Sequence, residues 1–263
     1  MLYISHMRIK NIIFFALSFT FINLVNAQTT WTGIASADWD NAGNWTTGIP
    51  DGSDVVTIPN VATNNPIINI SGAICGALTI ESAGLLTSNN VSNNLTAASI
   101  DLQSGGLLAI TNGEITSGNF IHAGVLTISG GTLDINGNYT SASNLIANIN
   151  GGTIEIAGNW DGTAVPSASP LNLFNPSGGT VTFNGAGAQA ISTHSSNNFH
   201  NLITTGSGTA VTLASAIIIA NDLTIGSGST LDVSNSDYAI SIKRDFSRSG
   251  TFTPQEGTVT LSG

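Results

Sequence analysis

The sequence predicts an all-β chain folded as a right-handed, single-stranded parallel β-helix, a solenoid of stacked coils. The first observation is a repeat, because GGTLDINGNY at 130–139 returns as GGTIEIAGNW at 151–160. The second is the alternation of apolar and polar residues in short runs separated by Gly-rich breaks, which indicates strands and turns. The third is the period, since a repeat of roughly 20–50 residues is typical of stacked architectures. The right hand follows from the general preference of parallel crossover connections.

The repeat can be followed along most of the chain. Runs at 56–58, 78–80 and 100–102 recur at a constant interval. One anchor position predicts coils of roughly 21–29 residues over 51–263, about nine coils in all; its members are Leu85, Leu107, Thr132, Thr153, Thr180, Thr209, Thr230 and Thr251. A single coil cannot bury its inner face alone, so stacking explains why the chain repeats itself. We therefore expect Leu133 and Ile135 to lie in register with Ile154 and Ile156.

Residues 1–27 form a segment of a different kind. Arg8 and Lys10 precede an apolar run at 12–25, and Val25-Asn26-Ala27 supplies small residues for cleavage. This pattern predicts a secretory signal peptide over 1–27, with Met1 and Met7 both open as the start. The run is shorter than the roughly 20 apolar residues that cross a membrane. We expect a secreted or cell-surface protein that does not insert into the membrane after cleavage.

Residues 28–50 are rich in tryptophan and precede the first predicted coil. Trp31, Trp39 and Trp45 lie in this segment, and Pro50 with Asp51-Gly52 forms an entry turn. The ends of a solenoid are exposed strand edges, so we interpret the segment as an N-terminal Trp-rich cap. Clustered indoles also stack on sugars, and Trp31, Trp39, Trp45 and Trp160 are therefore candidates for carbohydrate binding.

The charge pattern excludes whole classes of partner. Charged residues make up only 8% of the chain, against about a quarter in average globular proteins. Without the signal peptide three cations remain against 15 carboxylates, a net charge of −12, and no Lys or Arg occurs between Gln28 and Ile242. Nucleic acids and anionic membranes are held mainly by those residues, so we expect neither as a partner. Extracellular glycans and cell-surface proteins remain open. The cations Lys243, Arg244 and Arg248 are interpreted as a solvated turn with Asp245 as counter-ion.

Asp134 and Glu155 are the candidates for chemistry on the solenoid. They occupy matching positions of the repeat, one coil apart, between residues that point inward. Two carboxylates at neighbouring positions suit glycoside hydrolysis or a calcium ion. Solvated surface carboxylates are the simpler interpretation, so we expect no catalytic residue, no metal and no cofactor, with Asp134 and Glu155 kept as the alternative for catalysis and for Ca²⁺.

Histidine and cysteine give no further site. His122 is isolated, and His194 and His200 flank a polar loop without a third ligand. Cys75 stands alone and is expected to pack as a small hydrophobic residue. The long Pro-containing segment at 161–179 is expected to bulge outward, where insertions in solenoids often line a binding face.

The C-terminal residues GTVTLSG at 257–263 copy GTVTFNG at 179–185, but the earlier copy continues into another coil. We expect the chain to be a fragment that stops within a repeat. A further domain carried by a stalk of coils is part of that expectation.

Two stretches resemble known families. WDNAGNW at 39–45, followed by Pro50 and DVVTIP at 54–59, resembles the N-terminal module of secreted bacterial β-helix proteins exported by the type IX system, and more loosely the start of the G8 domain. GGTVTFNGAGAQAI and ANDLTIGSGSTLDVSNSDYAISIKRDF are similar to repeats of those surface proteins and of filamentous-haemagglutinin-like adhesins. The resemblance covers nearly the whole mature chain, and it implies secretion and a surface or adhesive role. It implies no catalytic set that can be placed on this sequence.

Two functions therefore stay open. The first is a structural or adhesive scaffold at the cell surface, which includes a stalk that presents a distal domain. The second is a carbohydrate-active β-helix that uses outward carboxylates. Polysaccharide lyases of the β-helix class resemble this scaffold, but they pair calcium-binding carboxylates with an Arg or Lys base, and that base is missing from Gln28 to Ile242.

Overall fold

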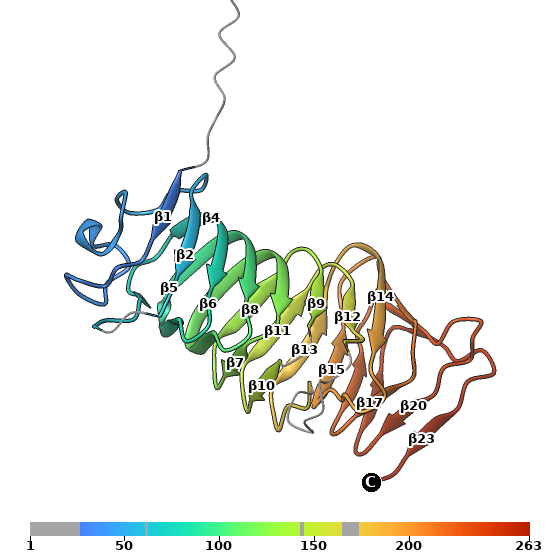
Figure 1. Ribbon diagram of the computed structural model, residues 1–263. Coiled ribbons are helices and arrows are strands. Elements are labelled where there is room, and N and C mark those ends of the chain that lie inside the picture. The colour runs from blue at the N-terminus through green and yellow to red at the C-terminus, as the bar shows by residue number, and fades with distance from the viewer. Residues whose placement is uncertain (1–26, 61–62, 143–144, 165–173) are drawn as a thin grey trace, which may run out of the picture.

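The computed structural model describes residues 27–60, 63–142, 145–164 and 174–263. These residues form a β-solenoid of parallel strands, which confirms the predicted all-β fold (Figure 1). The predicted signal peptide at 1–27 lies outside the described residues except for Ala27. The only helix among the described residues is the single 3-10 turn η1 (Ala42–Asn44). No helix in this part of the chain is long and apolar enough to cross a membrane.

The strands stack on three faces, which we call A, B and C in the order in which the chain visits them, beginning with β2 on face A. Face A holds β1 (Gln28–Thr30), β2 (Val55–Ile58), the last parts of β4, β5 and β6, then β9 (Tyr139–Ser141), β12 (Trp160–Gly162), β14 (Gly187–Thr193), β16 (Thr209–Leu213), β19 (Thr230–Asp232) and β22 (Thr251–Thr253). Every pairing along it is parallel. Because β1 pairs with β2, the strand stack begins at Gln28, within the segment expected to be cap alone.

Face B begins with β3 (Ile67–Ile68) and continues through the first parts of β5 (Leu85–Leu102) and β6 (Leu107–His122). It then holds β7 (Val125–Ile128), β10 (Ile146–Ile149), β17 (Ile217–Ile219), β20 (Ile240–Ile242) and β23 (Val259–Leu261).

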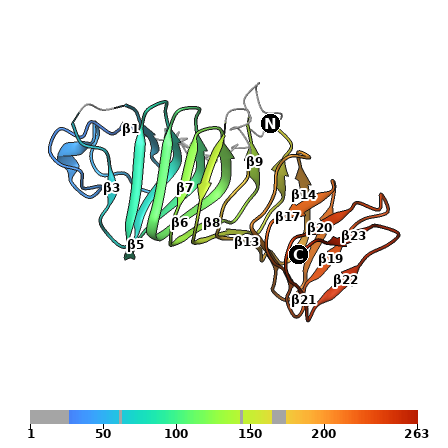
Figure 2. The ribbon, with the colours of Figure 1, turned by 90° about the horizontal axis from the view of Figure 1, so that it is seen from below.

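Face C begins with the first part of β4 (Ala73–Ile80) and continues through the middle parts of β5 and β6. It then holds β8 (Thr132–Ile135), β11 (Thr153–Ile156), β13 (Thr180–Phe183), β15 (Asn201–Thr204), β18 (Leu223–Ile225) and β21 (Phe246–Arg248). In the described residues face C therefore has nine levels, in agreement with the predicted number of coils. Figure 2 shows the stack from the cap to the C-terminal coils.

The register confirms the pairs predicted from the repeat. Leu133 aligns with Ile154 and Ile135 with Ile156, and all four side chains are at most 1% exposed. The runs at 56–58, 78–80 and 100–102 are also in register. Alternate residues point into the bore, which explains why apolar and polar residues alternate in these runs.

The predicted range of coil lengths is too narrow, because the expected anchor series changes face twice. Leu107 pairs with Val125 and not with Thr132. Thr180 pairs with Asn201 and not with Thr209. The step from Leu107 to Val125 is shorter than the prediction allows, and the step from Trp160 to its partner Ile191 is longer. All three faces carry the same alternation, so an anchor can move to the next face without breaking the pattern.

The repeated Gly-Gly pairs form the corner between faces B and C. Gly131, Gly152 and Gly179 have φ values of 69°, 65° and 73°, a left-handed conformation that favours glycine. At Gly152 an added Cβ would lie 2.7 Å from Cγ2 of Ile128. Both conformation and space therefore require glycine at this corner.

Candidate functional site

The three tryptophans of the cap are buried against one another. Trp31, Trp39 and Trp45 are 1%, 0% and 5% exposed. The ring of Trp45 meets Trp31 edge-on at 4.9 Å and Trp39 at 4.8 Å between centroids. Trp31 Nε1 donates to the carbonyl oxygen of Asn64 at 2.7 Å, and Trp45 Nε1 donates to that of Trp39 at 2.8 Å. The cluster covers the first coil as a plug would.

Trp160 lies inside the bore on face A, not on the surface. It is 1% exposed and stacks on Tyr139 of the preceding coil, with centroids 3.8 Å apart and ring planes 10° apart. Phe174 and Phe199 meet its edges at 4.7 and 5.2 Å. A sugar stacks on an exposed ring face, and none of the four indoles offers one in this arrangement. The aromatic position that the repeat shares, Tyr139 and Trp160, is a feature of the core.

His122 is fully buried in the same bore. Its Nδ1 lies 2.9 Å from the hydroxyl of Tyr139, and its Nε2 lies 3.3 Å from the carbonyl oxygen of Ile146. A neutral ring satisfies both contacts by accepting from Tyr139 and donating to Ile146. Burial lowers the pKa of His122 to about 4, so the ring is neutral near pH 7.

The fold also places Cys75 and His194, which the sequence offered as further reactive or metal-binding residues. Cys75 is 2% exposed, and burial followed by the charge of Asp54 raises the pKa of its thiol to about 12. A thiol in this state is not a nucleophile. His194 accepts at Nδ1 from the backbone N–H of Ser196 at 3.2 Å.

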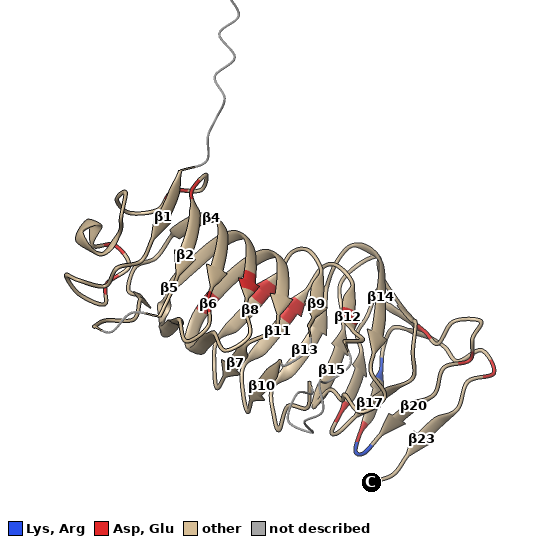
Figure 3. Ribbon diagram, in the orientation of Figure 1, with Lys and Arg blue, Asp and Glu red and all other residues tan. Residues whose placement is uncertain are grey.

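Asp134 and Glu155 are brought together on the outer side of face C, as the repeat predicted. They align directly in the pairing of β8 with β11. A third carboxylate, Glu114, extends this group by one coil, because it aligns with Thr132, two residues before Asp134. Figure 3 shows the three acidic positions side by side on β6, β8 and β11. We call Glu114, Asp134 and Glu155 the acidic row.

Sequence reasoning missed Glu114 because it assumed a longer coil at this point. With the short coil that the register has here, Glu114 falls one coil before Thr132. The alternating run Glu114-Ile115-Thr116 is the signal that could have revealed it.

Asp134 and Glu155 hold their protons more tightly than isolated carboxyls do. Partial burial raises the pKa of Asp134, and the charge of Glu114 raises it further. Partial burial likewise raises the pKa of Glu155, and the charges of Asp134 and Glu114 add to this effect. Asn184 opposes it by donating to Oε2 of Glu155 at 2.9 Å. Adjacent carboxyls with raised pKa values can act in proton transfer.

Amide side chains are hydrogen-bond partners of the acidic row. Asn136 donates to Asp134 at 3.5 Å, and Asn184 donates to Glu155. No group of three or more His, Cys, Asp or Glu residues in the described part of the chain is placed to hold a metal ion. The alternative of a Ca²⁺ ion at Asp134 and Glu155 stays a prediction.

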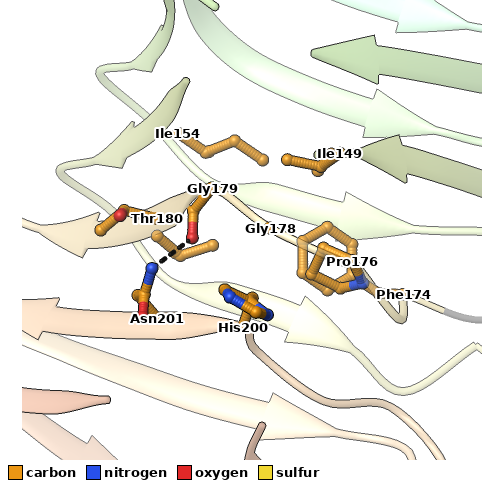
Figure 4. A pocket seen from close by; sticks show the side chains of 10 residues that line it. Ile149, Ile154, Phe174, Pro176, Gly178, Gly179, Thr180, His200 and Asn201 are labelled. Carbon is orange, nitrogen blue, oxygen red and sulfur yellow. Dashed lines mark hydrogen bonds between the residues drawn. The ribbon is translucent and has the colours of Figure 1, made fainter. Parts of the chain in front are cut away.

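A small gap lies at the corner between faces B and C, beside Gly178 and Gly179 (Figure 4). It has essentially no volume that a water molecule could fill, and Ile149, Ile154 and Phe174 form its apolar lining. Asn201 closes one side by donating to the carbonyl oxygen of Gly179 at 2.9 Å, and His200 lies beside it. Ligand pockets usually measure about 300–1,000 Å³, so this gap is too small for a typical ligand. The segment predicted as a binding turn, 161–179, lies outside the described residues at 165–173.

A comparison with protein families finds one match in this chain. A family described as a domain of unknown function (DUF8693) matches residues 30–145. The matched region contains the cap tryptophans, Glu114 and Asp134, but not Glu155 or Trp160. Neither the curated proteins nor the solved structures include a significant match to the chain.

Proposed function

We propose that the chain is an extracellular β-solenoid scaffold with a structural or adhesive role at a cell surface. One observation carries this proposal: the aromatic residues that could recognise a ligand are buried in the plug and in the bore. Trp39, Tyr139 and Trp160 are each at most 1% exposed. The outer sides of the three faces carry mainly polar side chains with few charges. Solenoid proteins bind their partners through extended surfaces of this kind.

Export is part of the same proposal. The segment at 1–27 has the pattern of a signal peptide, and the N-terminal module resembles type IX cargo and the G8 domain. Low charge and a surface of Ser, Thr and Asn agree with an extracellular setting. Nine levels at the usual strand spacing give a rod on the order of 40 Å, long enough to act as a spacer.

Two measurements test the scaffold proposal. Antibodies against the folded chain should label intact cells of the source organism without permeabilisation. Beads coated with the chain should then be retained on cells or on immobilised glycans more strongly than beads coated with an acidic globular protein of equal net charge. Labelling that requires permeabilised cells, or equal retention of both bead types, would contradict the proposal.

The acidic row favours a second candidate, a carbohydrate-active solenoid. Asp134 and Glu155 align on adjacent strands, and both have raised pKa values. One carboxyl that keeps its proton beside one that loses it is the pairing glycosidases use. The chain should then release reducing ends from a polysaccharide panel, and Asp134→Asn or Glu155→Gln should abolish that release. Asp161→Asn, on face A, is the matched control. No release from any substrate would leave the scaffold as the function.

A further inference from the structure

Asparagine followed by glycine is the sequence in which a backbone nitrogen attacks the preceding side-chain amide most readily, because glycine has no side chain to shield that nitrogen. The chain contains four such pairs, Asn112-Gly113, Asn136-Gly137, Asn150-Gly151 and Asn184-Gly185. The first lies within β6, and the other three lie at corners of the coil. The contacts of the glycine nitrogen and of the asparagine side chain distinguish these three.

The glycine nitrogen is hydrogen-bonded in two of the corner pairs. Gly137 donates its N–H to the carbonyl oxygen of Gly118 at 2.6 Å, and Gly151 donates to that of Ile128 at 3.3 Å. The N–H of Gly185 donates to no described residue. The nitrogen of Gly185 can therefore turn towards the side chain before it without breaking a hydrogen bond within the described chain.

The fold itself requires glycine at position 185. This residue follows β13 at the corner between faces C and A, and it is buried. An added Cβ would overlap the carbonyl oxygen of Ala157 on the coil below. Packing therefore keeps an unshielded backbone nitrogen next to the side chain of Asn184.

The side-chain amide of Asn184 lies against the acidic row. Its Nδ2, the nitrogen that leaves as ammonia in such a reaction, donates to Oε2 of Glu155 at 2.9 Å. The corresponding distance from Asn136 to Asp134 is longer, at 3.5 Å. Partial burial and the charges of Asp134 and Glu114 raise the pKa of Glu155, so this carboxyl keeps its proton to higher pH than an isolated one does. A carboxyl beside a leaving nitrogen is placed to act as a general acid.

We propose that Asn184 is a site of spontaneous deamidation, assisted by Glu155, and that the reaction adds a fourth carboxylate to the acidic row. The nitrogen of Gly185 forms a bond to Cγ of Asn184 and loses its proton to water. The Cγ–Nδ2 bond then breaks, and Nδ2 leaves as ammonia after it receives a proton from Glu155, which solvent protonates again. Water opens the resulting cyclic imide to aspartate or isoaspartate, so no reactant other than water is needed.

The product reverses an interaction on the outer side of face C. The amide of Asn184 donates to Glu155, whereas a carboxylate at the same place repels it. Isoaspartate also adds a methylene group to the backbone directly after β13, whose strand is aligned with β11. Deamidation would thus increase the negative charge of the row irreversibly as the protein ages. This proposal does not depend on an adhesive or enzymatic role.

The test incubates the full folded chain at neutral and at mildly acidic pH and follows each Asn-Gly pair by peptide mass spectrometry. Asn184 should convert several-fold faster than Asn136 and Asn150, which are internal controls in the same sample. In denaturant the three rates should become similar, because the fold no longer holds the glycine nitrogens. Asn184→Gln should show no conversion at this position, since the longer side chain closes a ring much less readily.

A second comparison tests the assistance by Glu155. Glu155→Gln keeps an oxygen that accepts from Asn184 but cannot deliver a proton, so conversion at Asn184 should slow several-fold, most of all at mildly acidic pH. The rate at Asn150 should not change. Glu81→Gln removes an acid outside the row and is the matched control for net charge.

Each outcome decides the proposal. Fast conversion at Asn184 that is lost in denaturant and slowed by Glu155→Gln supports it. If Asn136 or Asn150 converts as fast as Asn184 in the folded chain, or if Asn184 reacts only in denaturant, the proposal is wrong. An unchanged rate in Glu155→Gln would overturn the role of Glu155. Circular dichroism shows whether this variant folds, and the comparison of the three pairs in the wild type decides the site in either case.

Discussion

The inside and the outside of this solenoid come from the same alternating strands and carry different side chains. Inside, the plug and the bore bury large rings, with Trp39 at 0% exposed and Tyr139 stacked on Trp160. Outside, the strands carry polar residues and the carboxylates of the acidic row. Burial of apolar rings contributes stability, whereas neighbouring carboxylates on a solvated face contribute little to it or oppose it.

The comparison predicts that the plug matters most to stability. Trp39→Ala should lower the free energy of unfolding by about 3–5 kcal/mol, the usual cost of truncating a buried tryptophan. Chemical denaturation followed by circular dichroism measures the change, with Trp39→Phe as a milder control. Repeat proteins can lose end coils first, so the loss can appear as an early transition. A change under about 1 kcal/mol, far below the usual cost, would mean that the indoles do not close this end.

His122 lies in the middle of the stack, where coils cover it on both sides. The pH dependence of stability tests whether its ring is buried there. Because its pKa is about 4 in the folded chain and about 6.5 when unfolded, the unfolded state binds a proton first as the pH falls. Its neutral form therefore stabilises the fold above pH 6.5, and roughly 3 kcal/mol should be lost between pH 6.5 and 4. Tyr139 stays neutral in this range, whereas the raised pKa values of Asp134 and Glu155 shift stability in the opposite direction. Denaturation at several pH values should show a flatter profile for His122→Gln, and identical profiles would refute the assignment.

Much of this architecture can be predicted from the sequence, and particular residues show where prediction stops. The pairing of Leu133 with Ile154 followed from the repeat of 130–139 at 151–160, because identical spacing requires identical register. The change of face between Leu107 and Thr132 was not visible, because each face has the same alternation. The burial of the cap indoles depends on distant backbone, such as the carbonyl oxygen of Asn64 that Trp31 contacts. Glu114 can be placed in the acidic row only from the register, because the sequence does not show that the coil from Glu114 to Thr132 is short.

A pair of truncations compares an inward position with an outward one. Leu223 is 1% exposed, whereas Ile121, on the outer side of face A, is 44% exposed. Leu223→Ala should cost about 2–5 kcal/mol. Ile121→Ala should cost about 1 kcal/mol, since much of that side chain is already in water. Urea unfolding of both variants measures the difference. Equal losses would show that outward positions contribute as much stability as the bore, and the contrast between inside and outside would then fail.

The smallest expected effect lies on the body of the rod, away from both ends. Glu155→Gln removes a charge that lies beside Asp134 but keeps an oxygen that can accept from Asn184, which now donates at 2.9 Å. Relief of repulsion between neighbouring carboxylates should raise stability at pH 7 by about 0.5 kcal/mol, and less in high salt. The folded-state pKa of Glu155 is raised, so its destabilising effect is present above that pKa and disappears as the pH falls through it. The difference between variant and wild type should therefore vanish in acid. Glu81→Gln removes an acid outside the row and controls for net charge. If both variants gain equally, the benefit comes from the lower total charge, and the carboxylates of the acidic row do not repel one another measurably.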